Sequence, residues 1–343
     1  MRFAFRLAVG TMVFGTACIS LRPSVVDVTE TDAELVASGA APMPVVETYT
    51  ASLALDRIAK RRPELDGFSR RTGTGRGVSI YVFDGGVSTI HPELKGRVRA
   101  GFDAYPSNPR VCNAHGTAVA GAAAGRTLGV APAADVVDIK IINCLTKHGS
   151  AEAILAAARW VVADHVRHPD RPAVANWSFV VAPSDALETV NEAIEMLENA
   201  GILVVSAAGN VETDACRVSP ASSGSTLVVG ASALVRTDSV SFRDVRVAGT
   251  AWGRCVDVYA PGDSVLLPNL VDDAPTTALW SGTSMATGYV SGAAALVLEA
   301  MPSATPAQLT RVIERRATND VVDSRVRGRG VKRGRMVYIG PIE

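Results

Sequence analysis

The sequence lacks an excess of charge of either sign, because lysine and arginine together number 34 and so do aspartate and glutamate. No overall electrostatic field therefore draws the chain to nucleic acid or to an anionic membrane. Only 20% of the residues are charged, whereas 48% are hydrophobic. A chain of 343 residues with this balance is not disordered as a whole and can bury a large core. The composition predicts a globular protein without a nucleic-acid partner, built as one large domain or two ordinary ones.

The sequence also lacks a hydrophobic segment long enough to span a membrane. The apolar run from Leu7 to Ala17 contains 11 residues, and a spanning helix needs about 20. Arg2 and Arg6 precede this run, and small residues end it, which is the pattern of a signal peptide. We therefore expect residues 1–17 to be a signal peptide and the protein to be secreted or extracytoplasmic.

Cysteine is scarce and its number, five, is odd. In an exported chain four of these residues can form disulfides. The four are Cys112, Cys144, Cys216 and Cys255. The fifth, Cys18, follows the expected signal peptide and is either the lipid-modified first residue of a bacterial lipoprotein or a residue without such a role. The preceding residues lack the leucine usual three places before a lipidated cysteine, so both readings stay open. Any membrane attachment is expected only through Cys18.

The chain has no internal repeats, and residues 18–50 show little periodicity. Their Pro, Ser, Thr and acidic residues indicate a linker or a short propeptide. From residue 51 to residue 343, apolar β-branched runs alternate with stretches of helical spacing. The runs lie at 78–83, 136–142, 173–179, 202–207 and 226–229, and the helical stretches at 151–165, 185–200 and 284–301. This alternation predicts an α/β fold with a mainly parallel central sheet and helices on both faces.

Four polar residues, Asp84, His115, Asn210 and Ser284, each stand beside small residues and next to an apolar run. Taken singly, each has an ordinary structural interpretation: a turn residue, a core or surface histidine, a second turn residue and a helix N-cap. Together they supply the parts that peptide-bond hydrolysis needs. These parts are a hydroxyl nucleophile, an imidazole base, a carboxylate that orients the base and a donor for the oxyanion.

In this chain order the sequence resembles the subtilisin-like serine proteases, and most of all the proteinase K branch. The motifs that carry the likeness are Val82-Phe83-Asp84-Gly85-Gly86, His115-Gly116-Thr117, Ala207-Ala208-Gly209-Asn210 and Gly282-Thr283-Ser284-Met285-Ala286. It extends over roughly residues 53–338 and includes Leu55-Asp56-Arg57-Ile58, His91-Pro92-Glu93-Leu94, Ser219-Pro220-Ala221-Ser222, Val228-Val229-Gly230-Ala231 and Ala260-Pro261-Gly262.

The resemblance implies a three-layer subtilisin-like fold and a monomeric endopeptidase that acts on proteins or peptides through an acyl-enzyme. It implies that Asp84 orients His115, that His115 is first base and then acid, and that Ser284 is the nucleophile. Asn210 and the backbone N–H of Ser284 would form the oxyanion hole. Segment 18–50 is shorter than the pro-domain usual in secreted relatives, so the domain either folds unaided, helped by disulfides, or has a folding partner.

The resemblance also implies two disulfides and a calcium site. The expected pairs are Cys112–Cys144 and Cys216–Cys255. The carboxylate of Asp257, with backbone carbonyls near Gly224 and Thr226, resembles a structural calcium site, and calcium prefers such oxygen ligands.

The departures from the family pattern lie around the substrate. The substrate-binding strand, often Ser-Leu-Gly-Gly, reads Ser178-Phe179-Val180-Val181, and the facing segment, Leu145 to Gly149, includes His148 and Gly149 and carries one extra residue. Gly85 stands where the family usually has threonine or serine, and Gly288 stands where proline is common. Val180 and Val181 should narrow the pocket for a substrate side chain. The interpretations are a preference for small side chains, a restricted substrate set, or an inactive protease.

Two rival hypotheses remain. The main rival is a protein of the same fold that binds peptides or proteins without cutting them, against which the four retained residue types argue. The other is a nucleotide-binding enzyme, suggested by Gly73-Thr74-Gly75-Arg76-Gly77. This glycine-rich segment precedes a predicted strand, whereas a dinucleotide fingerprint follows one. The basic stretch 325–335 is interpreted as a surface hairpin.

Overall fold

The computed structural model describes residues 44–50, 52–181, 186–238, 241–324 and 334–341. The expected signal peptide, Cys18 and most of segments 18–50 and 325–335 lie outside these residues. Among the helices of the described part, none is long and apolar enough to cross a membrane.

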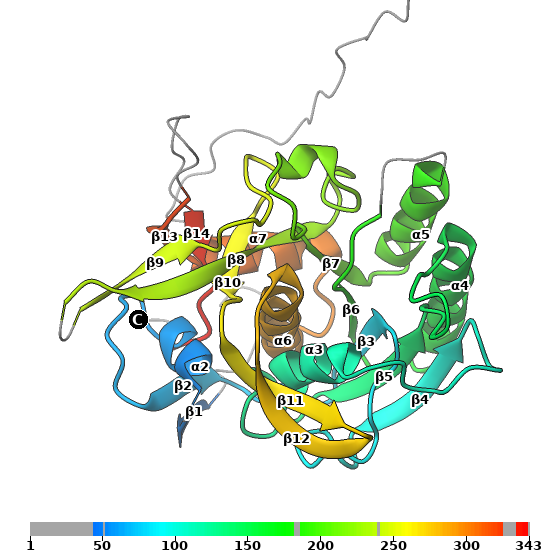
Figure 1. Cartoon of the computed structure of the whole chain (residues 1–343), viewed down its shortest axis with the longest axis horizontal. Coiled ribbons are helices and arrows are strands. Elements are labelled where there is room, and N and C mark those ends of the chain that lie inside the picture. Colours follow the sequence, from blue (N-terminus) through cyan, green and yellow to red (C-terminus); the bar gives the residue numbers. More distant parts are fainter. Residues whose placement is uncertain (1–43, 51, 182–185, 239–240, 325–333, 342–343) are drawn as a thin grey trace, which may run out of the picture.

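A ten-stranded sheet runs through the middle of the molecule (Figure 1). Its spatial order is β10-β14-β13-β9-β8-β7-β6-β3-β5-β4. The strands are β3 (Ser79–Asp84), β4 (Val98–Asp103), β5 (Asp135–Lys140), β6 (Ala173–Trp177), β7 (Leu203–Ala207), β8 (Leu227–Arg236), β9 (Phe242–Arg246), β10 (Val258–Pro261), β13 (Thr318–Asp323) and β14 (Gly334–Met336). Neighbours run parallel except at β8–β9 and β13–β14, so the predicted mainly parallel sheet is confirmed.

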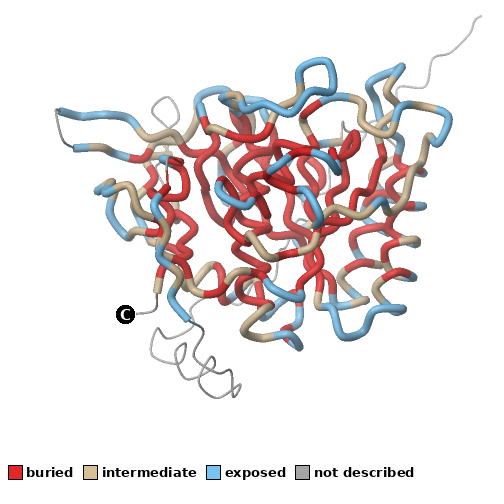
Figure 2. Tube along the Cα trace, turned by 90° about the horizontal axis from the view of Figure 1, so that it is seen from below, coloured by how far each residue is buried: buried red, intermediate tan, exposed pale blue. Residues whose placement is uncertain are grey.

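Helices cover both faces of this sheet. The helices are α2 (Leu53–Ile58), α3 (His115–Ala124), α4 (Ala151–Arg167), α5 (Leu187–Asn199), α6 (Thr283–Ala300) and α7 (Pro306–Arg316). Ile80 and Val82 of β3 pack into one core with α3, α6 and α7, whereas Tyr81 and Phe83 pack into a second core with α4 and α5. Because side chains alternate along a strand, β3 needs apolar residues on both faces, which explains its continuous apolar run. The buried residues occupy the interior of the trace (Figure 2), and the predicted three-layer α/β fold is confirmed.

Two small sheets lie outside the central one. Strands β11 (Val265–Val271) and β12 (Ala274–Trp280) form a hairpin that packs on α3. There Gly121 allows close approach, because an added Cβ would lie 2.4 Å from the ring of Pro268. Strand β1 (Val45–Tyr49) pairs antiparallel with β2 (Phe68–Thr72).

Strand β1 lies at the end of the expected linker or propeptide, in residues 45–49, and the predicted boundary at residue 51 stays a prediction. Its burial pattern shows two partly buried residues, Val46 and Thr48, between exposed ones. The strand therefore depends on backbone pairing with β2 more than on an apolar face of its own, and such a strand leaves little pattern in a sequence.

Candidate active site

The carboxyl ends of neighbouring parallel strands bring the predicted site residues to one edge of the sheet. Asp84 is the last residue of β3. Ser178 follows the last residue of β6, and Asn210 lies three residues after the end of β7. Phe83 pairs with Trp177 and Trp177 with Ser206, so the three strand ends lie side by side. This edge is where ligands of open α/β sheets usually bind.

Asp84 and His115 form a hydrogen-bonded pair at this edge. The His115 Nδ1 lies 2.8 Å from Asp84 Oδ2, and the backbone N–H of Gly85 donates to Asp84 Oδ1 at 2.7 Å. His115 begins α3. The next residue, Gly116, lets the helix end approach, since an added Cβ would lie 2.5 Å from the Gly86 carbonyl oxygen. The charge of Asp84 raises the pKa of His115, against the opposing effect of burial. The carboxylate thus favours a proton on this imidazole.

Ser284 lies in the first turn of α6, which follows Gly282 at a φ of 137°. Its Oγ donates to the Ser178 carbonyl oxygen at 3.0 Å, and Ser178 Oγ donates to the Ser284 carbonyl oxygen at the same distance. The hydroxyl therefore points to the substrate segment in this structure.

The packing of α3 against α6 explains one departure from the family pattern. An added Cβ at Gly288 would lie 2.7 Å from the Val119 carbonyl oxygen and 2.9 Å from the Cβ of Ala122. An added Cβ at Gly292 would lie 2.5 Å from the Ala123 carbonyl oxygen. Gly288 therefore allows the helix that carries Ser284 to approach the helix that begins at His115, and it does not by itself indicate a lost activity.

The amide of Asn210 is oriented by Thr283, a residue that sequence reasoning did not single out. The backbone N–H and the hydroxyl of Thr283 both donate to Asn210 Oδ1, at 2.9 Å and 3.1 Å. Because a backbone N–H can only donate, the oxygen of the amide must face Thr283 and the NH2 group must face away. Its position directly before Ser284, inside the serine motif, is the sequence feature that could have identified Thr283.

In the predicted substrate-binding segment after β6, neighbouring residues have different surroundings. Phe179 stacks on Trp177 with ring centroids 5.3 Å apart. The N–H of Val181 donates to the Ser219 carbonyl oxygen at 2.9 Å. Val180 is 40% exposed. His148 and Gly149 lie in an exposed stretch between β5 and α4, and their role toward substrate stays a prediction.

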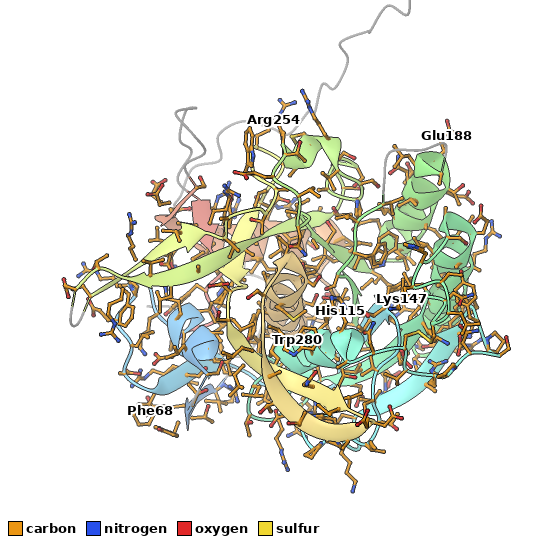
Figure 3. The ribbon with its side chains drawn as sticks, in the orientation of Figure 1. Phe68, His115, Lys147, Glu188, Arg254 and Trp280 are labelled. Carbon is orange, nitrogen blue, oxygen red and sulfur yellow. A yellow bond between two sulfur atoms is a disulfide. The ribbon has the colours of Figure 1, made fainter. Side chains whose placement is uncertain are left out.

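Trp280, which ends β12, was missed by sequence reasoning because nothing in its local pattern marks it. Its ring meets that of His115 edge-on with centroids 6.3 Å apart, and the two lie together in Figure 3. Behind the site, Arg110 Nε donates to Asp138 Oδ2 at 2.7 Å. Burial raises the pKa of Asp138 to about 6, with Arg110 opposing.

Both predicted disulfides are present, Cys112–Cys144 and Cys216–Cys255. The first lies close to the Asp84–His115 pair, because the N–H of Cys112 donates to the Gly85 carbonyl oxygen at 2.8 Å. It therefore ties the segment before α3 to the end of β3 and to the segment after β5.

The proposed calcium ligands have the right chemistry but form no carboxylate cluster. Asp257 is buried, and its Oδ2 accepts the N–H of Val228 at 2.8 Å. The hydroxyl of Thr226 bonds to that of Ser206 at 2.8 Å, and Gly224 is exposed. Among the described residues no group of three or more His, Cys, Asp and Glu side chains is placed to hold a metal. One carboxylate with backbone carbonyls fits the oxygen preference of calcium.

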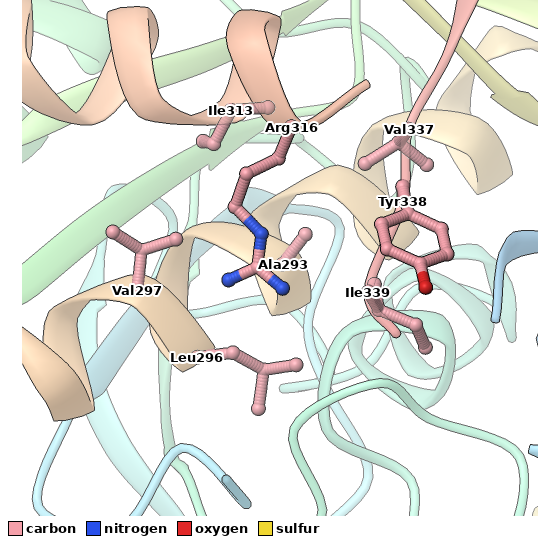
Figure 4. A pocket seen from close by; sticks show the side chains of 8 residues that line it. All are labelled: Ala293, Leu296, Val297, Ile313, Arg316, Val337, Tyr338 and Ile339. Carbon is pink, nitrogen blue, oxygen red and sulfur yellow. The ribbon is translucent and has the colours of Figure 1, made fainter. Parts of the chain in front are cut away.

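A separate small cavity lies between α6, α7 and residues 337–339. It is lined by Ala293, Leu296, Val297, Ile313, Arg316, Val337, Tyr338 and Ile339 (Figure 4). Arg316 donates to the Gly340 carbonyl oxygen at 2.7 Å, and burial lowers its pKa. The cavity uses the second half of α6, whereas Ser284 is at the start of that helix, so the cavity is not part of the candidate active site.

A hydrogen-bonded Asp–His pair at the strand ends of an α/β sheet, with a serine in the first turn of a helix that packs against the helix of the histidine, is an arrangement typical of serine hydrolases. The chain belongs to the subtilase family, which it matches over residues 75–331.

Named relatives agree with this membership. The chain is 39% identical over 274 residues to an extracellular serine proteinase of Thermus sp. (strain Rt41A), a match that covers 79% of this chain and 63% of the relative. It is 37% identical over 274 residues to alkaline serine exoprotease A of Vibrio alginolyticus, covering 79% of this chain and 48% of that protein. The chain thus spans about half to two thirds of the length of these relatives.

A solved structure supports the fold. A cold adapted subtilisin-like serine proteinase matches with a TM-score of 0.70 and 34% identity, over 85% of this chain and 99% of that one. The subtilisin-like fold is therefore confirmed, whereas the narrower likeness to the proteinase K branch stays a prediction.

Proposed function

We propose that this protein is an exported serine endopeptidase that hydrolyses peptide bonds of proteins or peptides through an acyl-enzyme. The observation that carries the proposal is the 2.8 Å hydrogen bond between Asp84 and His115, which begins the helix packed against the helix that holds Ser284. Family membership supports the same activity, since the relatives described above are named as serine proteinases or proteases.

The hydrogen bond of His115 to Asp84 indicates which of its ring nitrogens acts as the base. Because Nδ1 donates to Asp84, Nε2 is the ring nitrogen that can take the proton of Ser284 Oγ as this oxygen attacks the substrate carbonyl carbon. His115 then gives that proton to the leaving amine, and the same imidazole activates the water that hydrolyses the acyl-enzyme.

The oxyanion of the tetrahedral intermediate would receive hydrogen bonds from Asn210 Nδ2 and from the Ser284 backbone N–H. The orientation of the Asn210 amide supports this role, since Thr283 holds its oxygen and turns its NH2 group away. The N–H of Ser284 lies in the first turn of α6, where backbone donors lack helical acceptors. Removing one such donor costs about 10²- to 10³-fold in kcat in the subtilisin example of this effect.

Covalent labelling with a fluorophosphonate probe tests the proposal, because the probe reports an activated serine without a known substrate. We expect the mature protein to be labelled and the Ser284→Ala variant to be unlabelled. Absence of labelling in folded, calcium-supplied, processed protein would contradict a protease. It would favour the rival hypothesis of a peptide-binding protein, with which the hydrogen bond of Ser284 to Ser178 is compatible.

We also propose that Asp257, with carbonyl oxygens near Gly224 and Thr226, holds a structural calcium ion. An ion that binds only the folded state stabilises it, by about 2.7 kcal/mol at a concentration 100 times the Kd. We expect a chelator to lower the Tm of the wild type and to leave the Tm of Asp257→Asn unchanged. An equal chelator effect in both proteins would place the ion elsewhere.

The extracytoplasmic location is proposed from the predicted signal peptide and from the extracellular relative. Mass spectrometry of the intact mature protein shows whether Cys18 carries lipid. Diacylglycerol on this residue would add a large mass to the N-terminal peptide. We propose a monomer, and its molar mass in solution tests this.

A further inference from the structure

The position of a substrate on the proposed enzyme follows from the contacts of Ser284. An acyl group on Ser284 Oγ has its carbonyl oxygen toward Asn210. Ser284 Oγ lies 3.0 Å from the Ser178 carbonyl oxygen, so that oxygen is within reach of the N–H of the acylating residue. The Cα of that residue then lies between the segments that contain Ser178 and Asn210. Its side chain must enter the space between them.

Val180 faces this space from the segment that follows β6, because its Cγ1 lies against Gly209. Phe179 turns to the opposite side, where it stacks on Trp177 in the core beside α5. Ser178 turns toward α6, where its hydroxyl reaches the Ser284 carbonyl oxygen. Val180 turns toward Gly209, where a built Cβ would lie 3.1 Å from Val180 Cγ1.

Three valine side chains converge on Gly209, the residue before Asn210. A Cβ built on Gly209 would lie 3.1 Å from Val180 Cγ1, 3.4 Å from Val218 Cγ1 and 3.7 Å from Val211 Cγ2. The surface that Gly209 would offer to a substrate side chain is therefore covered by methyl groups from three separate segments.

The far end of the space is closed as well. The hydrogen bond from Val181 N–H to the Ser219 carbonyl oxygen joins the substrate segment to the residue after Val218. Val218 is only 7% exposed, so it cannot swing out into solvent without disrupting its neighbours. Val180, by contrast, is 40% exposed and stands at the entrance. Of Val180 and Val218, Val180 is therefore the side chain that can be shortened with less disturbance of its neighbours.

We propose that Val180, backed by Val218 and Val211, fills the pocket for the residue on the acyl side of the cleaved bond, so that the enzyme cuts after glycine or alanine. This inference rests on the proposed endopeptidase function and names its substrate class. Glycine and alanine need little or no space beyond the Cβ, whereas leucine and phenylalanine need the volume that the Val180 methyl groups occupy.

A series of chromogenic peptides tests the inference. The peptides share all residues except the one before the scissile bond, which is glycine, alanine, leucine or phenylalanine. For the wild type we expect kcat/KM for alanine to exceed that for phenylalanine by at least about tenfold, the scale at which hydrophobic pockets discriminate by size. In Val180→Gly the ratio of phenylalanine to alanine should rise by about tenfold or more, and Val180→Ala should give an intermediate ratio.

Val235→Gly is the matched control. Val235 is 38% exposed, close to the value for Val180, but it lies in β8 opposite Arg243 of β9. The same substitution there should leave the wild-type ratio unchanged. Circular dichroism and the Tm identify any variant that has lost its fold, in which case Val180→Ala replaces Val180→Gly in the comparison.

The outcomes separate this inference from the proposed function. Labelled wild-type protein that cuts after phenylalanine as fast as after alanine would overturn the inference and leave the endopeptidase in place. An unchanged ratio in folded Val180→Gly and Val180→Ala would also overturn it. A protein that is neither labelled nor active on any peptide would contradict the function itself, and the inference with it.

Discussion

At the scale of single residues, the Asp84–His115 pair determines whether stability rises or falls with pH. Asp84 raises the pKa of His115 above its ordinary value of 6.5. A group with a raised folded pKa binds its proton more tightly in the folded state. The stability that this pair contributes is therefore fully present below pH 6.5 and is lost as the pH rises through the folded pKa. Catalysis has the opposite requirement, since a general base must be neutral.

We therefore predict that kcat/KM falls on the acid side as His115 becomes protonated, and that Asp84→Asn moves this fall to lower pH. The same change should reduce kcat by about 10⁴-fold, as in the well-studied triad, because the imidazole loses its correct tautomer. The measurement is the pH profile of an activated ester, whose hydrolysis stays measurable at low activity.

Asp135→Asn provides the control for this profile. Asp135 starts β5 and pairs with Arg171 at 2.8 Å, so the variant also loses an ion-paired carboxylate, but away from the site. Its acid limb should match that of the wild type. An Asp84→Asn profile with the wild-type midpoint would mean that another charge sets the pKa of His115.

The sequence allowed us to predict candidate catalytic residues, but not the residues that contact them. Asp84, His115, Asn210 and Ser284 were predicted because their types and order carry chemical meaning. Trp280 and the Arg110–Asp138 pair were not, since their roles depend on which segments become neighbours only after folding.

At the scale of elements, the contact between α3 and α6 sets the relative position of His115 and Ser284. We predict that Gly288→Ala destabilises the protein by about 1–3 kcal/mol, because the new methyl group would meet the backbone of Val119 at 2.7 Å. Helix propensity alone predicts the reverse, a gain of up to about 1 kcal/mol. The sign of the change in the free energy of unfolding, measured by urea denaturation, decides between the two. A stabilised variant would mean that the helices can separate slightly at no cost.

The elements that sequence predicted are those with continuous apolar runs. The run at 78–83 became β3, and the stretch at 284–301 became α6 with a shift of one residue. The strands that were missed, such as β12 with its largely exposed residues, bury too little apolar surface to leave a clear pattern. Their pairing partners are set by the fold around them.

At the scale of the whole molecule, the fold class could be predicted from the alternating apolar runs, and both disulfide pairs from the resemblance that the sequence shows. Strand β1 could not be predicted, because it depends on its pairing with β2. The depth of the substrate pocket could be predicted only as a narrowing, since the contributions of Val211 and Val218 come from segments that meet Val180 only in three dimensions.

The last prediction concerns the Cys112–Cys144 disulfide, which acts on stability and on the site together. The bond closes a loop with a sequence separation of 32. A loop of this length constrains the unfolded chain by roughly 3–4 kcal/mol on the chain-entropy model. The Cys112→Ala/Cys144→Ala variant should therefore unfold at a lower Tm in calorimetry.

The activity of this variant should decline on heating before global unfolding, because the segment that leads into His115 loses its covalent link while keeping the backbone N–H bond from position 112 to Gly85. The Cys216–Cys255 disulfide closes a loop of similar separation, 39. The Cys216→Ala/Cys255→Ala variant should therefore lose similar stability, with activity lost only at the unfolding transition. If both variants lost activity together with their structure, the first disulfide would be a stabilising link without a local role at the active site.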